Sequence, residues 1–219
     1  MRAVIWLNYP VAIMKLALIL PLALVAFIGA ARAEEADDIR EANKTETETF
    51  NARMYAGTPG KTAYACFVRR YDAEHLARHP NQKVAAMKLL VSAEIDQEDK
   101  QLHNSFRLGF RYRHRNGDFD SSGSCHHVVF TKDGGEVRLG CGVDCEGGGI
   151  GVALSKDDKS AVVRLASVRV WLHNKPDDEA ERSLVAGSDD GIFRLDRTDN
   201  SECAALVTDR KELAALRHK

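Results

Sequence analysis

Hydrophobic and polar residues alternate with a period of two along much of the chain. The clearest example is the segment 106–112, where the residues between the arginines and the glycine are all large and apolar: Phe106, Leu108, Phe110 and Tyr112. Successive side chains of a strand point to opposite faces of a sheet. This pattern therefore predicts an antiparallel strand with one buried face and one solvated, basic face.

The same pattern predicts further strands on both sides of this segment. They are expected at residues 62–71, 83–95, 126–131, 136–141, 150–155, 161–173, 191–196 and 203–208. The apolar run 83–95 is also long enough for a helix, and we favour a strand there because another strand follows after a polar loop. Turn residues such as Asp, Asn and Gly separate the segments.

Two helices are predicted beside these strands. Residues 73–79 form a short one, with Asp72 as its N-cap and Pro80 as its stop. Residues 209–218 form a C-terminal one, with Leu213 and Leu216 facing inward. About eight strands with little helix predict a mainly β fold, a single antiparallel β-barrel or β-sandwich over residues 61–219.

The first 33 residues have the features of a secretory signal peptide. They contain three basic residues and no acidic one, an apolar run over residues 16–30, and the sequence Ala31-Arg32-Ala33. We predict cleavage after Ala33, which leaves no transmembrane anchor and a periplasmic or secreted protein. The apolar run is short for a helix that spans a bilayer. Translation is predicted to begin at Met14, because that start gives a more regular signal peptide.

The segment that follows, residues 34–60, is predicted to be a flexible acidic leader, with a short helix as the alternative. Residues 34–49 are polar and contain almost no large apolar side chain that burial could stabilise. Removing residues 1–33 takes away three of the 31 Lys and Arg and none of the 32 Asp and Glu. The remaining chain is therefore acidic, which argues against binding to nucleic acids.

The chain contains five cysteines, and we consider all of them candidates for disulfides: Cys66, Cys125, Cys141, Cys145 and Cys203. An exported protein folds in an oxidising compartment, so disulfides are the expected state, and an odd number leaves one thiol over. Three pairings are reasonable: Cys66 with Cys203, Cys125 with Cys141, or Cys141 with Cys145. The sequence leaves the choice between them open.

The register of one hairpin affects this choice. A three-residue turn at residues 132–134, with Gly134 in the left-handed region, places Cys125 opposite Cys141. A two-residue turn at Asp133-Gly134 places His126 opposite Cys141 instead. The second register matches apolar residues better, so both registers stay open.

A zinc or copper site is the alternative to disulfides. Cys125, His126, Cys141 and Cys145 are all suitable ligands for these metals. However, adjacent residues such as His126 and His127 point to opposite faces of a strand, which makes a shared site harder to build.

Two other groups of residues are candidates for binding. Asp118, Asp120 and Ser122 have the spacing at the start of a calcium-binding loop, although its last acidic ligand is missing, and a plain polar turn is favoured. A basic stripe on the chain is a candidate contact surface for an anionic partner, although such a face is more usually only solvated. The stripe consists of Arg107, Arg111, Arg113 and Arg115.

The sequence contains no G-x-S-x-G, H-E-x-x-H or paired-carboxylate pattern, so we expect neither an enzyme nor a bound cofactor. The prediction is an exported, disulfide-stabilised β-domain that acts as a non-catalytic binding or inhibitory module. Its partner would be an envelope or extracellular protein, a glycan or a lipid. A periplasmic zinc- or copper-binding protein is the alternative.

Overall fold

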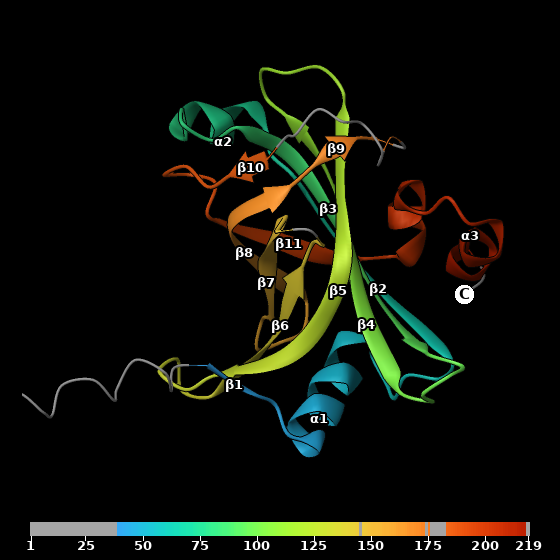
Figure 1. Cartoon of the computed structure of the whole chain (residues 1–219). Coiled ribbons are helices and arrows are strands. Elements are labelled where there is room, and N and C mark those ends of the chain that lie inside the picture. The colour runs from blue at the N-terminus through green and yellow to red at the C-terminus, as the bar shows by residue number, and fades with distance from the viewer. Residues whose placement is uncertain (1–38, 145, 174, 176–182, 218–219) are drawn as a thin grey trace, which may run out of the picture. The chain divides into compact units, whose positions relative to one another are not determined.

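A computed structural model describes residues 39–144, 146–173, 175 and 183–217 of the chain (Figure 1). The predicted signal peptide lies outside the described residues, and so does Cys145. Among the helices that are described, none has the length and hydrophobicity to span a membrane.

A closed, eight-stranded antiparallel β-barrel forms the body of the protein. Each strand pairs with the next along the chain, and the last pairs with the first. The strands are β2 (Thr62–Arg70), β3 (Val84–Ile95), β4 (Leu102–Tyr112), β5 (Asp118–Phe130), β6 (Glu136–Gly142), β7 (Gly148–Leu154), β8 (Ser160–Arg169) and β11 (Ile192–Thr198). The predicted mainly β fold is confirmed, and the barrel is the architecture found.

Three short strands extend the sheet outside the barrel. β1 (Ile39–Glu41) and β9 (Trp171–Leu172) both pair with β5, and β10 (Ser183–Val185) pairs with β8. The short helix predicted after β2 is confirmed as α2 (Ala73–Arg78), where the side chain of Asp72 accepts a hydrogen bond from the backbone N–H of His75 at 2.7 Å.

Large apolar side chains fill the interior of the barrel. Those that are almost completely buried include Phe67, Leu89, Phe106, Leu108, Phe119, Leu139 and Phe193. The alternation predicted for residues 106–112 is confirmed, because Phe106, Leu108 and Phe110 point inward. An eight-stranded barrel is just wide enough for side chains to fill it. The interior is therefore a packed core rather than a container for a ligand.

The helix α1 (Lys44–Met54) lies at one end of the barrel (Figure 1). It corrects the prediction of a flexible leader for residues 44–54 and agrees with the alternative of a short helix. Phe50 is 2% exposed and Met54 is fully buried, and both belong to the barrel core. Asn43 and Glu46 form a capping box that satisfies the first N–H groups of the helix. Hydrogen bonds from Arg40 and from the backbone of Asn43 lower the pKa of Glu46 to about 2. The segment is ordered because two apolar side chains, one helical turn apart, enter the core.

Arg197 fastens the other end of α1 to the barrel. Its guanidinium donates hydrogen bonds to the backbone carbonyls of Met54 and Asp158 at 2.8 and 2.7 Å, and it lies 4.7 Å from the centre of the Phe67 ring. The last carbonyls of a helix have no partner within the helix, so a half-buried cation there stabilises it. α1 therefore plugs the barrel.

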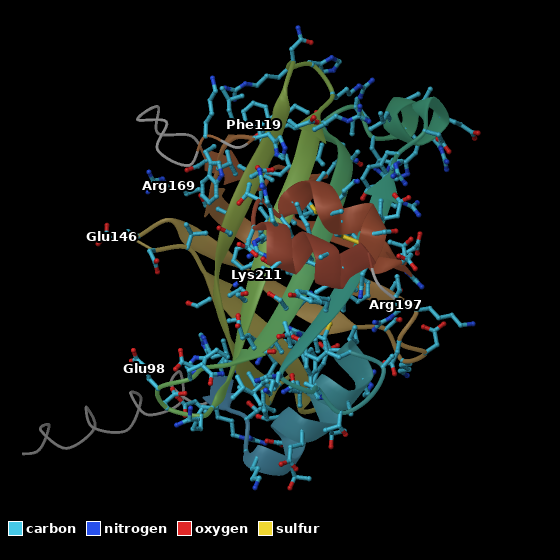
Figure 2. The ribbon with its side chains drawn as sticks, turned by 90° about the vertical axis from the view of Figure 1, so that its right-hand side faces the viewer. Glu98, Phe119, Glu146, Arg169, Arg197 and Lys211 are labelled. Atoms are coloured by element: carbon cyan, nitrogen blue, oxygen red, sulfur yellow. A yellow bond between two sulfur atoms is a disulfide. The ribbon has the colours of Figure 1, made fainter. Side chains whose placement is uncertain are left out.

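A second, smaller core lies outside the barrel, beneath the 3₁₀ helix η1 (Asn200–Leu206) and the helix α3 (Arg210–Arg217). Figure 2 looks onto this face, where both helices lie across the strands. The predicted strand at 203–208 is wrong. Cys203 instead bonds to Cys66 on the outer face of β2, and the side chain of Asp199 caps η1. The C-terminal helix is confirmed, with Leu216 buried in this core.

Two disulfides are present, Cys66–Cys203 and Cys125–Cys141. The β5–β6 hairpin has the register in which Cys125 faces Cys141 and Val129 faces Val137, with Gly134 at a φ of +74°. The register with better apolar matching is wrong, because the longer of the two possible turns connects the strands. The pairing of Cys141 with Cys145 is also excluded, since Cys141 is bonded to Cys125.

Replacing Phe50 by alanine tests whether α1 belongs to the folded core. We expect Phe50→Ala to lower the free energy of unfolding by about 3–5 kcal/mol, because it leaves a cavity at the plugged end. Thr49→Ala, at an exposed position of the same helix, is the control and should change stability by less than about 0.5 kcal/mol. Urea unfolding measures both, and equal stability of the two variants would contradict the plug.

Removing each disulfide in turn tests their contributions to stability. Cys66→Ala with Cys203→Ala should cost about 5 kcal/mol and Cys125→Ala with Cys141→Ala about 3 kcal/mol, because the bonds span 137 and 16 residues. Chemical denaturation of the two double variants gives the comparison. A larger loss from the shorter loop would show that the chain-entropy argument does not govern this protein.

Candidate functional site

The structure separates the four arginines of the predicted basic stripe. Arg107 lies beneath α3 and makes two hydrogen bonds to the carboxylate of Glu212, at 2.5 and 3.0 Å. Arg113 donates a hydrogen bond to the carbonyl of Leu76 at 2.9 Å, after β4 has ended. Arg115 stacks on the ring of Phe119. The four side chains therefore do not form one continuous surface.

Arg111 is the member of the stripe that lies in a groove on the outside of the barrel. We call this hollow, of about 290 Å³, the outer groove. Its floor is formed by the outward faces of β2 to β5, one wall by Ala205 and Leu206 of η1, and the other by His173 after β9. The side chain of Arg111 is 63% exposed and lies 4.0 Å from a carboxylate oxygen of Asp118.

The outer groove is hollow because two small residues occupy its floor. Strand pairing places Ala86 between Arg70 and Arg111, and Gly109 is next to Lys88. A β-carbon on Gly109 would lie 2.4 Å from Cδ2 of Leu206, so the glycine leaves room for this side chain of η1 on the floor. Charged side chains surround these small residues and form the edge of the outer groove.

The edge of the outer groove carries charges of both signs on different strands. Arg70, Lys88 and Arg111 project from β2, β3 and β4, whereas Asp118 and Asp120 project from β5. Two of the cations also hold η1: Arg70 contacts the carboxylate of Glu202 at 2.8 Å, and Lys88 donates to the backbone carbonyl of the same residue at 2.5 Å. The groove therefore presents a basic side and an acidic side.

His173 and Asp120 form the most buried polar contact in the outer groove. Nδ1 of His173 lies 2.7 Å from Oδ2 of Asp120, and the backbone N–H of His173 donates to the carbonyl of Asp118 at 2.9 Å. The Asp120 and His173 side chains are 17% and 32% exposed. This pairing fixes the orientation of the imidazole, which can donate or accept a further hydrogen bond at its other nitrogen.

The structure gives the calcium-loop hypothesis no support. Asp118, Asp120 and Ser122 lie at alternate positions of one face of β5, which is an extended strand and not a loop that wraps a cation. Asp120 pairs with His173 instead. Within the described part of the chain, no group of three or more His, Cys, Asp or Glu side chains is placed to hold a metal ion.

The zinc or copper hypothesis loses two of its ligands, because Cys125 and Cys141 are joined to each other and not available as thiolates. The other two members do not compensate for this loss. His126 is exposed on the opposite face of β5, and Cys145 lies outside the described residues. The cysteines of this hairpin therefore stabilise the fold.

Sequence reasoning missed most of the outer groove. Arg111 was predicted as part of the basic stripe, and Asp118 and Asp120 as part of a calcium-binding loop. His173, Lys88 and the small residues of the floor were not considered, because they meet only through the pairing of strands distant in sequence. The alternation of 106–112 with a glycine on its basic face was the one visible signal.

Comparison of the chain with family models, with curated proteins and with solved structures finds no match in any of the three.

His127, next to His126, has a half-buried imidazole that contacts α1. Its Nε2 lies 2.9 Å from Oδ1 of Asn51, and its ring meets the ring of Phe50 edge-on at 5.4 Å. Burial, with a smaller contribution from His126, lowers the pKa of His127 to about 4. The folded protein therefore keeps this imidazole neutral down to that pH.

The free energy of unfolding should depend on pH through His127. Between pH about 6.5 and about 4 the unfolded state takes up a proton that the folded state does not, so stability falls as the pH is lowered, by up to about 3 kcal/mol. His127→Gln keeps a donor for Asn51 but cannot titrate. Urea unfolding of both proteins from pH 8 to pH 4 should show a smaller slope for the variant. Parallel curves would contradict an imidazole that stays neutral in the folded protein.

Proposed function

We propose that this protein is an exported, non-catalytic binding module that engages its partner through the outer groove. The observation that carries the proposal is the groove itself, a hollow with charges of both signs over a barrel whose interior is filled. A closed and plugged barrel offers little room inside, so its outer surface is the place for recognition.

Export is supported by two features of the chain. The first 33 residues have the charge, the apolar run and the small-residue ending of a signal peptide. Two disulfides join strands and helices of the barrel, and such bonds persist in oxidising compartments. We therefore place the working protein in the periplasm or outside the cell.

The charge pattern of the outer groove indicates the partner. Its basic side would attract a carboxylate, and its acidic side, with Asp120 and His173, would accept hydrogen bonds from an amine or a guanidinium. A protein segment that carries an acidic and a basic side chain close together presents both groups. We infer that the partner is such a segment of an envelope or extracellular protein.

A non-catalytic role fits the groups that surround His173 and Asp120, the dyad of the outer groove. His173 and Asp120 resemble the base and its orienting carboxylate in hydrolases, but the described lining of the groove contains no Ser, Thr or Cys side chain that could act as nucleophile. The dyad then serves to bind and orient the partner. No cofactor is needed for this role.

A variant that fills the outer groove tests the proposal. A tetrapeptide of alternating Glu and Lys is the probe, and NMR titration of the labelled protein is the measurement. We expect perturbed signals at Gly109 and His173 with a dissociation constant at or below about 1 mM. Ala86→Phe should weaken binding at least tenfold, because the new ring occupies the floor.

Ala166→Phe is the matched control, since Ala166 is an exposed residue of another barrel strand. It should bind the peptide as the unmodified protein does. A tetrapeptide of serine should cause no saturable shift in any of the three proteins. Equal binding by both phenylalanine variants, or shifts confined to residues outside the groove, would exclude the outer groove as the contact site.

A further inference from the structure

A second hollow lies at the end of the barrel near α2. We call it the rim cleft. It measures about 350 Å³ and is bounded on one side by residues 80–83, and on the other by Tyr112, His114 and Arg115. Lys83 and Arg115 bring two positive charges to it and His114 an imidazole, and among the described residues that line it none is an Asp or Glu.

The loop that forms one side of the rim cleft is held rigidly. Gln82 is 4% exposed, donates to the carbonyl of Val84 at 2.6 Å and contacts Nε2 of His75 at 2.9 Å. The buried carboxylate of Asp190 accepts hydrogen bonds from the backbone N–H groups of Lys83 and Val84, at 2.8 and 3.3 Å. This carboxylate therefore faces the backbone of the loop, and the Lys83 ammonium is exposed to solvent.

Arg115 is held on the other side by aromatic rings. Its guanidinium lies 4.6 Å from the centre of the Phe119 ring and 5.7 Å from that of Tyr112. When a guanidinium lies over aromatic rings, its N–H groups point outward in the plane of the guanidinium, where they can donate to an oxyanion. The weak contact of Lys83 Nζ with the Val185 carbonyl, at 3.4 Å, leaves the ammonium able to turn toward the same ligand.

We propose that the rim cleft binds a phosphate group. A tetrahedral oxyanion offers enough acceptor oxygens to meet a guanidinium, an ammonium and an imidazole that approach from different sides. A single carboxylate presents only two oxygens. The site is separate from the outer groove in its residues and does not depend on the function proposed above. The phosphate group belongs either to a soluble molecule or to a lipid headgroup.

Titration with inorganic phosphate, followed by NMR at constant ionic strength, tests the site. The expected result is saturable shifts of the backbone signals of residues 81–83 and 114–115, with a dissociation constant in the range of about 1–10 mM. The double variant Lys83→Gln with Arg115→Gln should bind phosphate at least tenfold more weakly. No saturable shift up to about 50 mM phosphate would overturn the proposal.

Lys156→Gln with Arg194→Gln is the matched control. It removes the same two charges from exposed positions elsewhere on the barrel and should leave phosphate binding unchanged. Equal weakening in both double variants would mean that net charge, and not the rim cleft, attracts phosphate. That result would also overturn the proposal.

Sedimentation with vesicles distinguishes the two sources of the phosphate group. Phosphatidylglycerol vesicles that carry down the unmodified protein but not the Lys83/Arg115 variant would identify a lipid headgroup, with phosphatidylcholine vesicles as the neutral control. Phosphate binding without vesicle binding would identify a soluble phosphate compound. Vesicle binding without binding of inorganic phosphate would contradict a specific site, because overall surface charge would then explain it.

Discussion

Closure of the barrel depends on the pairing of β5 with neighbours on both edges. β4 pairs along residues 118–125 of this strand, and β6 pairs on the opposite edge along residues 124–130. The two partners overlap near Gly123, where a β-carbon would lie 1.9 Å from the carbonyl oxygen of Gly142, so only glycine fits. Cys125–Cys141 then fixes the register beside this crossing. The filled interior, the plug and the sites on the outside all follow from this closure.

Much of the fold could be predicted from the chain because the strands alternate strongly and the turns are polar. Besides the strand expected at 203–208, which is a 3₁₀ helix, the hairpin register and the helix α1 were not fixed by the pattern. The hairpin at 125–141 allowed two registers, since apolar matching and turn length favoured different ones. The helix α1 was only the alternative to a flexible leader because its composition is polar, although the spacing of Asn43 and Glu46 is that of a capping box and Phe50 and Met54 are four residues apart. Their burial depends on a barrel end that local sequence does not reveal.

The candidate site was predicted far less well than the fold. The predicted stripe required all four arginines to lie on one face of one strand. However, β4 ends at Tyr112, and the residues beyond it point in other directions. The outer groove instead combines Arg111 with Ala86, Asp120 and His173, which come from four segments. Such a site arises from register and from the absence of side chains on its floor, and both are properties of the assembled sheet.

We propose recognition on the outside of the barrel because the inside is filled, and α1 closes one end. Amide hydrogen exchange measured residue by residue tests this claim most directly. The account predicts that the amides of Phe50 to Met54 are protected nearly as strongly as those of Leu89 and Leu139, since all would open only with the whole barrel. Exchange in α1 that is faster by orders of magnitude, with the strands still protected, would contradict it and would reopen the barrel interior as a binding site.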